Sequence, residues 1–548
     1  MSPIPPEVPM SRRLRPFVLV AVSSLIAASV FAALSPASAA TRTKPRWVRH
    51  VHHYSGGISN GVRERLAVVE GKTTWTKLAT RSAKLAAFPT LDNGQLNGDT
   101  DPPLPQDEPG VALNLDDPMN AVAASNDYTG DGFWIGYTTD GGRTWTSQWK
   151  DPKFSFDGGR CFASDPTVAY SLRDHSFYMG TLCYFSTTPA SEIHVWKSTD
   201  GGVTWTPSTK AAVVVTNHHS DGTIDASIFN DKELMTVDNE PSSAHYGRIY
   251  VTYTKFHMTG GSFARSDYCP IQAAYTDSIP TANPSTSVWQ HTPIVPDDPG
   301  GNGRGASANQ FSTPVVDEDG GLDVGFVSED CNTSYDRALL FARSTDGGAS
   351  FGDVVRVDRP GEWVDNSNRN DNLPAKGDVR FPGTIGFAYD ATRDRLVYLA
   401  QNAIADSSSI SGHVSDDFGA TWESATWVSV SGSGGPARGD QFFPAVGVDS
   451  AGDYFAIWQD TRNDQNDHRI ETFQGMSTDG GVTWTNQLIS TASFDPRQSF
   501  FTCGCFIGDY NQIAVSDEVI YPTWTDGRNS AGRPVGDTDI FGNVEIRT

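Results

Sequence analysis

Basic residues and long apolar runs are both scarce in this 548-residue chain. Its 41 lysines and arginines stand against 65 acidic residues, and the formal net charge is −24. An acidic surface disfavours nucleic acids and anionic membranes as partners. Beyond residue 40 no apolar run is long enough to span a bilayer, so we expect no membrane span. Helical periodicity is almost absent from the larger part of the chain, which excludes a helical bundle and favours short β-strands.

The single long apolar run, from Phe17 to Leu34, follows three arginines and precedes Ala37-Ser38-Ala39. A basic start, an apolar middle and a small-residue end are typical of a cleaved signal peptide. We therefore predict a signal peptide over residues 1–40, an N-terminal extension over 41–105 and the folded domain over 106–548. The mature protein is expected to be secreted.

Cysteine is also scarce, with six residues in the chain. An even number in an exported protein favours disulfides over metal ligands. Proximity along the chain suggests Cys161 with Cys183, Cys269 with Cys331, and Cys503 with Cys505. The last pair would close a very small ring, so a labile bridge or two free thiols are the alternatives there.

One short unit is abundant, and the rest of the chain is organised around it. Residues 476–484 read Met-Ser-Thr-Asp-Gly-Gly-Val-Thr-Trp, and the same order of side chains recurs at 138–145, 198–205, 344–351 and 415–422. An aspartate before two glycines predicts a tight turn, because the carboxylate accepts backbone N–H groups and glycine allows positive φ. The tryptophan that follows is expected to place its ring between packed sheets.

This unit resembles the Asp-box, or BNR repeat, of the sialidase superfamily of β-propellers. The resemblance implies an all-β propeller and a sialidase-like activity, with the boxes on the rim and away from the substrate. That family pairs an arginine triad with an aspartate acid/base and a tyrosine–glutamate nucleophile. Its Phe-Arg-Ile-Pro motif does not precede the first box here, whereas Val379-Arg380-Phe381-Pro382 resembles the motif but comes late in the chain.

First strands recur at the spacing of propeller blades. They start near Pro109, Pro166, Glu233, Pro314, Pro382, Pro444 and Asn511. Seven starts predict seven blades, and a six-bladed, sialidase-like ring with one start misread is the alternative. The blade around residues 276–289 has lost its box. The last start leaves room for only three strands, so we expect a segment before Pro102, such as Thr73–Leu78, to supply the fourth and close the ring.

The first strand of each blade lines the channel, so the residues just before these starts should converge on one mouth. Two positions before the starts are Asp107, Ser164, Asp231, Ser312, Arg380, Phe442 and Asp509. One position before are Glu108, Asp165, Lys232, Thr313, Phe381, Phe443 and Tyr510. Side chains alternate along a strand, so one set should dominate the channel. Both sets contain acids, which predicts a carboxylate-lined mouth.

From these sets we select Asp509, Tyr510, Arg380, Asp107 and Asp231 as catalytic candidates. Clustered carboxylates shift one another's pKa, which allows a general acid and a general base to coexist and suits glycoside cleavage. An arginine can hold a substrate carboxylate by paired hydrogen bonds. The alternatives are that the same acids bind calcium, the one cofactor considered, or only cap backbone N–H groups.

The leading hypothesis is a secreted, sialidase-like glycoside hydrolase that acts on an extracellular glycan or glycoconjugate. A non-catalytic propeller that binds carbohydrate or protein is the first alternative, and a polysaccharide lyase is the second. Fold alone does not choose among these classes. The sequence leaves the sugar, the linkage and the oligomeric state open.

Overall fold

The chain divides into two compact units, Met1–Thr43 and Lys44–Thr548. The computed structural model describes residues 44–53, 58–71, 85–87, 93–98, 104–258, 268–295, 309–328, 338–359, 372–373, 379–380, 383–404, 407–499, 506–530 and 537–547. The predicted signal peptide lies outside these ranges. No helix within them is long and apolar enough to cross a membrane.

Seven of the antiparallel sheets in the described residues are the blades of a seven-bladed β-propeller. The first three blades are β3 (Gln106–Leu113), β4 (Ala121–Asp127), β5 (Phe133–Thr138) and β6 (Thr144–Lys150) with the added strand β1 (Leu85–Ala87); β7 (Thr167–Ser171), β8 (Ser176–Tyr184), β9 (Ser191–Ser198) and β10 (Ala212–Thr216); and β11 (Ile228–Val237), β12 (Ile249–His257), β13 (Ile271–Thr276) and β14 (Gln290–Pro293).

The next three blades are β15 (Gln310–Val316), β16 (Leu322–Ser328), β17 (Ala338–Ser344) and β18 (Val355–Arg356); β21 (Ile385–Asp390), β22 (Arg395–Ile404), β23 (Ser407–Ser415) and β24 (Thr426–Trp427); and β25 (Gln441–Val448), β26 (Tyr454–Asp460), β27 (Glu471–Ser477) and β28 (Thr485–Leu488). The seventh contains β29 (Gln512–Val515), β30 (Val519–Asp526), β31 (Asp539–Gly542), β32 (Glu545–Ile546) and β2 (Gly94–Gln95). The predicted seven blades are confirmed, and the six-bladed alternative is wrong.

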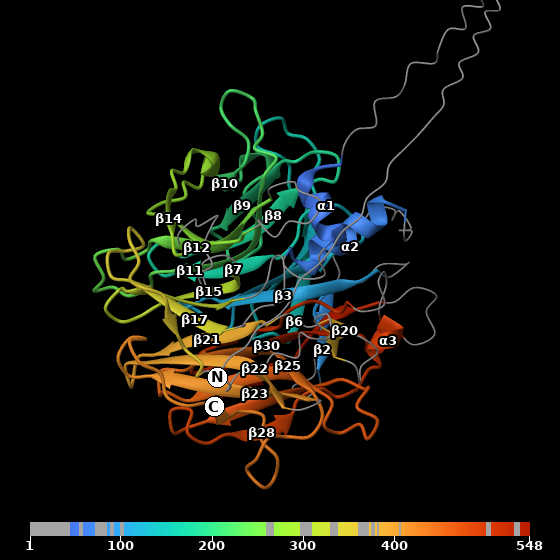
Figure 1. Ribbon diagram of the computed structural model, residues 1–548, viewed down its shortest axis with the longest axis vertical. Coiled ribbons are helices and arrows are strands. Elements are labelled where there is room, and N and C mark those ends of the chain that lie inside the picture. Colours follow the sequence, from blue (N-terminus) through green and yellow to red (C-terminus); the bar gives the residue numbers. More distant parts are fainter. Residues whose placement is uncertain are drawn as a thin grey trace, which may run out of the picture. The chain divides into compact units, whose positions relative to one another are not determined.

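The blades form a closed ring. Their first strands contact one another in the order β3, β7, β11, β15, β21, β25, β29 and back to β3, and Figure 1 shows several of them side by side. The seventh blade takes its fourth strand from β2, where Gly94 pairs with Gly542. A strand from the N-terminal side therefore joins the last blade and covers an edge that would otherwise be open. The segment predicted for this role, Thr73–Leu78, lies outside the described residues.

The five repeats form tight hairpins between the third and fourth strands of their blades, and we call them the repeat hairpins. In the last one, Asp479 accepts hydrogen bonds from the Ser477 hydroxyl at 2.8 Å and the Thr483 N–H at 2.9 Å. Gly480 and Gly481 have φ of +76° and +88°, as the predicted turn requires. The carboxylates of Asp140, Asp200, Asp346 and Asp417 accept the same pair of bonds.

Disulfide formation follows the prediction where it can be seen. Cys161 and Cys183 are joined, and Cys269 is also disulfide-bonded. The other three cysteines lie outside the described residues. The Cys161–Cys183 bridge connects the segment before β7 to the second strand of the same blade.

Two helices precede the propeller, α1 (Arg46–His53) and α2 (Asn60–Val69). They share one apolar core with strands of the second and third blades, to which Trp47, Val62 and Leu66 contribute. Figure 1 shows both helices, in blue, beside β8. The sequence predicted only an N-terminal extension here, because helices of eight and ten residues are too short to give a clear helical pattern. The one later helix described is α3 (Pro496–Ser499), and the described 3-10 turns are Ser208–Lys210, Pro284–Thr286 and Arg528–Ser530.

We expect Trp484→Ala to lower the free energy of unfolding by about 3–5 kcal/mol, because a large ring is lost from a packed core. Trp484 is 7% exposed, and its ring lies 6.3 Å from that of Tyr454. Chemical denaturation measures the loss. Val482→Ala is the matched control, since Val482 lies in the same hairpin and is 63% exposed. Equal stability of the two variants would contradict a buried role for the tryptophan.

Candidate functional site: the mouth of the central channel

Several blades have a residue in the left-handed region in or just before the first half of their first strand. Glu108, Asp165, Lys232, Phe311 and Phe443 have φ between +55° and +59°. The pairing of β3, β11, β15 and β25 shifts at this point, which marks a β-bulge. A bulge breaks the alternation of side chains, so that neighbouring residues can face the same space. The expectation that one set of residues dominates the mouth is therefore wrong.

The bulges also correct the predicted register in two blades. In the fourth blade the left-handed residue is Phe311, preceded by Gln310, whereas the sequence count placed Ser312 and Thr313 there. In the seventh blade the left-handed residue is Gly508, at φ +93°. The count failed because it took Pro314 as the equivalent of Pro109, while the residue at that place after the bulge is Ser312.

Asn126, the second-last residue of β4, holds the acids of neighbouring blades together. Its Nδ2 donates to Asp107 Oδ1 at 3.1 Å and also to Glu108 Oε2. Its Oδ1 accepts the backbone N–H of Asp165 at 2.9 Å. Glu108 in turn accepts the N–H of Asp509 at 3.1 Å. One amide and one carboxylate thus connect the first, second and seventh blades.

Lys232 brings a positive charge into this group of acids. Its Nζ lies 3.2 Å from the centroid of the Tyr510 ring and 3.5 Å from Asp165 Oδ1. An ammonium over an aromatic face is a stabilising cation–π contact. Next to it, Glu233 is fully buried, and within the described part of the chain neither of its carboxylate oxygens has a hydrogen-bond partner. The Tyr510 hydroxyl also lacks a partner among the described residues.

Burial changes the proton affinity of these acids. Desolvation, helped by the charge of Asp165, raises the pKa of Asp231 to about 7, although hydrogen bonds from Gln310 and Ser59 oppose the change. Desolvation also raises the pKa of Asp107, Glu108 and Glu233 well above their ordinary values. The pKa of Tyr510 is raised by burial and then by the surrounding carboxylates. Asp231 is thus able to hold a proton near neutral pH.

The start of α2 covers the mouth. The Ser59 N–H donates to Asp231 Oδ2 at 2.8 Å. Gly61 lies so close to the second blade that a Cβ on it would be 2.0 Å from Ser164 Oγ and 2.8 Å from Asn126 Nδ2. Asp231 is consequently 0% exposed.

Arg65, one turn further along α2, fixes the helix on the first blade. Its guanidinium donates to the backbone carbonyls of Asp127, Gly130 and Gly132 at 2.9, 2.6 and 2.7 Å. The carbon at its centre also lies 5.1 Å from the centroid of the Tyr128 ring. The side chain is 2% exposed, so its charge is directed at the loop between β4 and β5 and away from solvent.

Inside the ring, the channel contains a cavity of about 150 Å³. Its walls come from the first strands of several blades and include Gly110, Thr167, Met235 and Tyr510. Tyr510 therefore borders both the acids and this cavity.

Four of the five predicted catalytic residues meet at the mouth: Asp107, Asp231, Asp509 and Tyr510. Arg380 lies in β20 (Val379–Arg380), which pairs with β19 (Asn372–Leu373) in a small separate sheet. The Arg380 side chain is outside the described residues. The prediction missed Glu233, because the strand was taken to start there, and it missed Asn126, because only first strands were counted.

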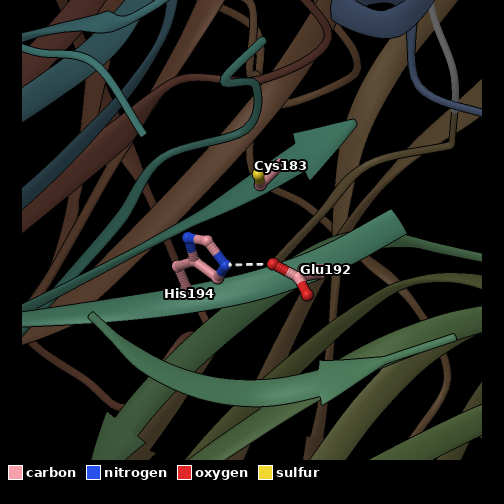
Figure 2. A group of neighbouring side chains, drawn as sticks. All are labelled: Cys183, Glu192 and His194. Carbon is pink, nitrogen blue, oxygen red and sulfur yellow. Dashed lines mark hydrogen bonds and ion pairs between the residues drawn. The ribbon is translucent and has the colours of Figure 1, made fainter. Parts of the chain in front are cut away.

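A second group of polar side chains lies in the second blade. His194 Nε2 and Glu192 Oε2 are 2.8 Å apart, with Cys183 next to them (Figure 2). Burial tends to raise the pKa of Glu192, but hydrogen bonds from His194 and Ser155 outweigh it and the pKa is lowered. The Cys183 sulfur is bonded to Cys161 and is no thiolate, so this group lacks the third ligand that a metal site would need.

Calcium prefers six to eight oxygen ligands close around the ion. Among the described residues, the only three acidic, histidine or cysteine side chains whose ligand atoms lie within 4.8 Å of one another are Cys183, Glu192 and His194. The described acids of the mouth are not part of such a group.

Comparison with known proteins gives distant structural likenesses. No protein-family description matches the chain, and no curated protein matches it. The chain is similar to a Hadza microbial sialidase, with 13% identity, 75% of this chain and 76% of that chain covered, and a TM-score of 0.42. It is also similar to an α-L-arabinanase of Penicillium chrysogenum, with 12% identity, coverage of 70% and 92%, and a TM-score of 0.39. It is similar as well to an intramolecular trans-sialidase of Ruminococcus gnavus. The identity is 11%, 81% of this chain and 94% of that chain are covered, and the TM-score is 0.38.

We expect the protein to be more stable at pH 5 than at pH 8. Asp231 has a pKa of about 7 in the folded chain and 3.8 ordinarily. Its protonated form therefore stabilises the fold fully below about pH 4, and this contribution is lost as the pH rises through about 7. Asp107, Glu108 and Glu233 act in the same direction. Calorimetric melting temperatures across this range measure the effect.

Asp231→Asn should make the melting temperature less dependent on pH, because the amide has no proton to lose. Asp353→Asn is the control, since it removes an exposed carboxylate far from the mouth. A melting temperature that rises steadily from pH 5 to pH 8 in the wild-type protein would contradict the assignment.

Proposed function

We propose that this protein is a secreted glycoside hydrolase that cleaves extracellular glycans at the channel mouth. The observation that carries the proposal is the group of buried carboxyl groups from different blades, in which Asp231 has a pKa of about 7. A glycosidic oxygen needs a proton as it leaves, and an acid with a pKa near the working pH supplies it best. Lys232 and Tyr510 complete a polar site of the kind that orients a sugar.

Asp231 is the general acid in this proposal, because it is protonated at a pH where ordinary aspartates are ionised. In the sialidase-like form of the proposal, Tyr510 attacks the anomeric carbon while Asp231 protonates the leaving oxygen. Glu233 receives the phenolic proton in its ionised form, for which its raised pKa makes it a stronger base than an ordinary glutamate, and neither of its oxygens has a partner among the described residues. Water then breaks the tyrosine–sugar bond, with the ionised Asp231 as general base. Asp107 and Asp509 have a positioning role. Asp107 accepts a hydrogen bond from Asn126, and the N–H of Asp509 donates to Glu108.

A second candidate is a non-catalytic propeller that binds glycan or protein. The observation in its favour is the cover that α2 forms over the mouth, since Ser59 and Gly61 occupy the space a substrate would need. In this alternative the acids are structural, and binding takes place elsewhere on the propeller. Activity against any glycoside separates the two candidates.

We expect hydrolysis of at least one member of a panel of chromogenic glycosides that includes sialosides. Because α2 covers the mouth, the panel is applied both to the wild-type chain and to Gly61→Leu. On the substrate that is cleaved, Asp231→Asn should reduce turnover by at least about a hundredfold, the lower range for general acid–base catalysis. Tyr510→Phe tests the nucleophile separately. If both variants keep wild-type turnover, the chemistry does not occur at this mouth.

We expect Arg380→Ala to raise KM for sialosides while leaving KM for neutral glycosides nearly unchanged. The reason is that the sequence places Arg380 two positions before a predicted strand start, as it does Asp107, and a guanidinium can hold a carboxylate by two parallel hydrogen bonds. Arg143→Ala is the control, because its guanidinium bonds the carbonyl of Asp140 within the first repeat hairpin. Equal effects on both classes of substrate would remove Arg380 from sugar recognition.

A further inference from the structure

We propose that α1 and α2 form a removable plug, and that the chain is a latent enzyme while this plug covers the mouth. The plug is defined as residues 44–53 and 58–71. The inference deepens the proposed function and rests on it, because latency requires that the mouth be the active site. It names how access to that site is controlled.

The plug and a substrate cannot occupy the mouth together. A single carbon added to Gly61 would already lie 2.0 Å from Ser164 Oγ and 3.3 Å from Glu108 Oε2. The Ser59 N–H takes one oxygen of Asp231, the group that the proposal makes the general acid. A sugar ring is much larger than one carbon, so it can reach Asp231 only after α2 has moved.

The propeller does not depend on the plug for its sheets. The plug contributes no strand to any blade, and the described strands begin at Leu85. The ring closes through β2, which lies after the plug in the chain and pairs with β31. Removal of the plug therefore breaks no strand-to-strand hydrogen bond of the seven blades.

Some interactions between plug and mouth stabilise the closed state, and others destabilise it. Trp47, Val62 and Leu66 are buried in a shared apolar core, which holds the plug in place. At the tip of the plug, the Ser59 hydroxyl and Arg65 Nε are buried without a hydrogen-bond partner among the described residues. A buried polar atom without a partner destabilises the closed state, because it has lost its hydrogen bonds to water.

The acids of the mouth also destabilise the closed state. Asp107, Asp165 and Asp231 each have one buried carboxylate oxygen without a partner among the described residues. These groups regain water when the plug leaves, so the mouth opposes the closure that the apolar core favours. A contact built in this way can hold the mouth shut and still be released by one local change.

Gly61→Leu is the sharpest test, because the new side chain forces α2 away without altering any acid of the mouth. The control is Gly432→Leu, since Gly432 is exposed and a Cβ on it meets nothing within 4 Å. Two readouts are measured on the full chain. One is glycoside hydrolysis, and the other is acylation of Lys232 by an amine-reactive ester, followed by peptide mass spectrometry.

Lys232 is 2% exposed and should resist acylation in the wild-type and Gly432→Leu proteins. In Gly61→Leu it should react at least about tenfold faster, as expected when a covering segment opens locally. Hydrolysis should rise in the same variant only. Fast acylation without any hydrolysis would uphold the opening of the mouth but overturn both the enzyme and its latency. A binding protein would then be the remaining assignment.

Two results would overturn the plug while leaving the hydrolase intact. One is hydrolysis that is equal in wild type and Gly61→Leu although Lys232 has become reactive. The other is Lys232 that stays protected in a folded Gly61→Leu protein. Should Gly61→Leu fail to fold, Arg65→Gln replaces it, because it removes the charged donor to the carbonyls of Asp127, Gly130 and Gly132. The same two readouts then decide.

Discussion

A left-handed residue at the start of a first strand is the constraint on which the mouth depends. Glu108, Asp165 and Lys232 hold a positive φ that costs about 1–3 kcal/mol at each residue other than glycine. The surrounding ring fixes these residues, because each first strand is held by its own blade and by the first strands on either side. As a result, neighbouring side chains reach the same space, as when Asp107 and Glu108 meet one amide of Asn126. In regular strands, consecutive side chains would point to opposite faces and could not meet in this way.

Burial and protonation of the mouth support each other. Ionised carboxylates would be very costly beneath α2, and Lys232 is the one positive charge that lies directly among them in the described residues. Raised pKa values remove part of this cost, since a protonated acid is easier to bury. The helix also contributes, because its N-terminal end carries a partial positive charge and presents the Ser59 N–H to Asp231. The cover that desolvates Asp231 therefore also offers it a hydrogen bond. Together with the hydrogen bond from Gln310 and the charge of Lys232, this bond limits the rise in the pKa of Asp231 to about 7.

The sequence predicted what depends on local pattern. The turn at Asp479 and the spacing of strand starts were enough for the fold class and the number of blades, and the phase of the starts placed Asp107, Asp231 and Tyr510. What was missed depends on distant contacts. A two-residue strand such as Gly94–Gln95 carries no periodic signal, and Gly61 gives no sign in the sequence of the second-blade residue it touches. The register error at Phe311 arose because Pro314 was taken as the equivalent of Pro109, whereas Ser312 holds that place after the bulge.

The repeat hairpins and the mouth both contain aspartates, but the pKa of Asp479 and that of Asp231 are shifted in opposite directions. Strands within a blade alternate in direction, so the hairpins after the third strands lie at the opposite end of the blade from the start of the first. At Asp479 burial tends to raise the pKa, but hydrogen bonds from Thr483 and Ser477 outweigh it and the pKa is lowered. At Asp231 desolvation prevails and the pKa is raised. A carboxylate satisfied by its own turn stabilises the blade and takes no part in chemistry. The repeats therefore identify the architecture, whereas the proposed chemistry depends on residues such as Asp231, Lys232 and Tyr510, which no repeat contains.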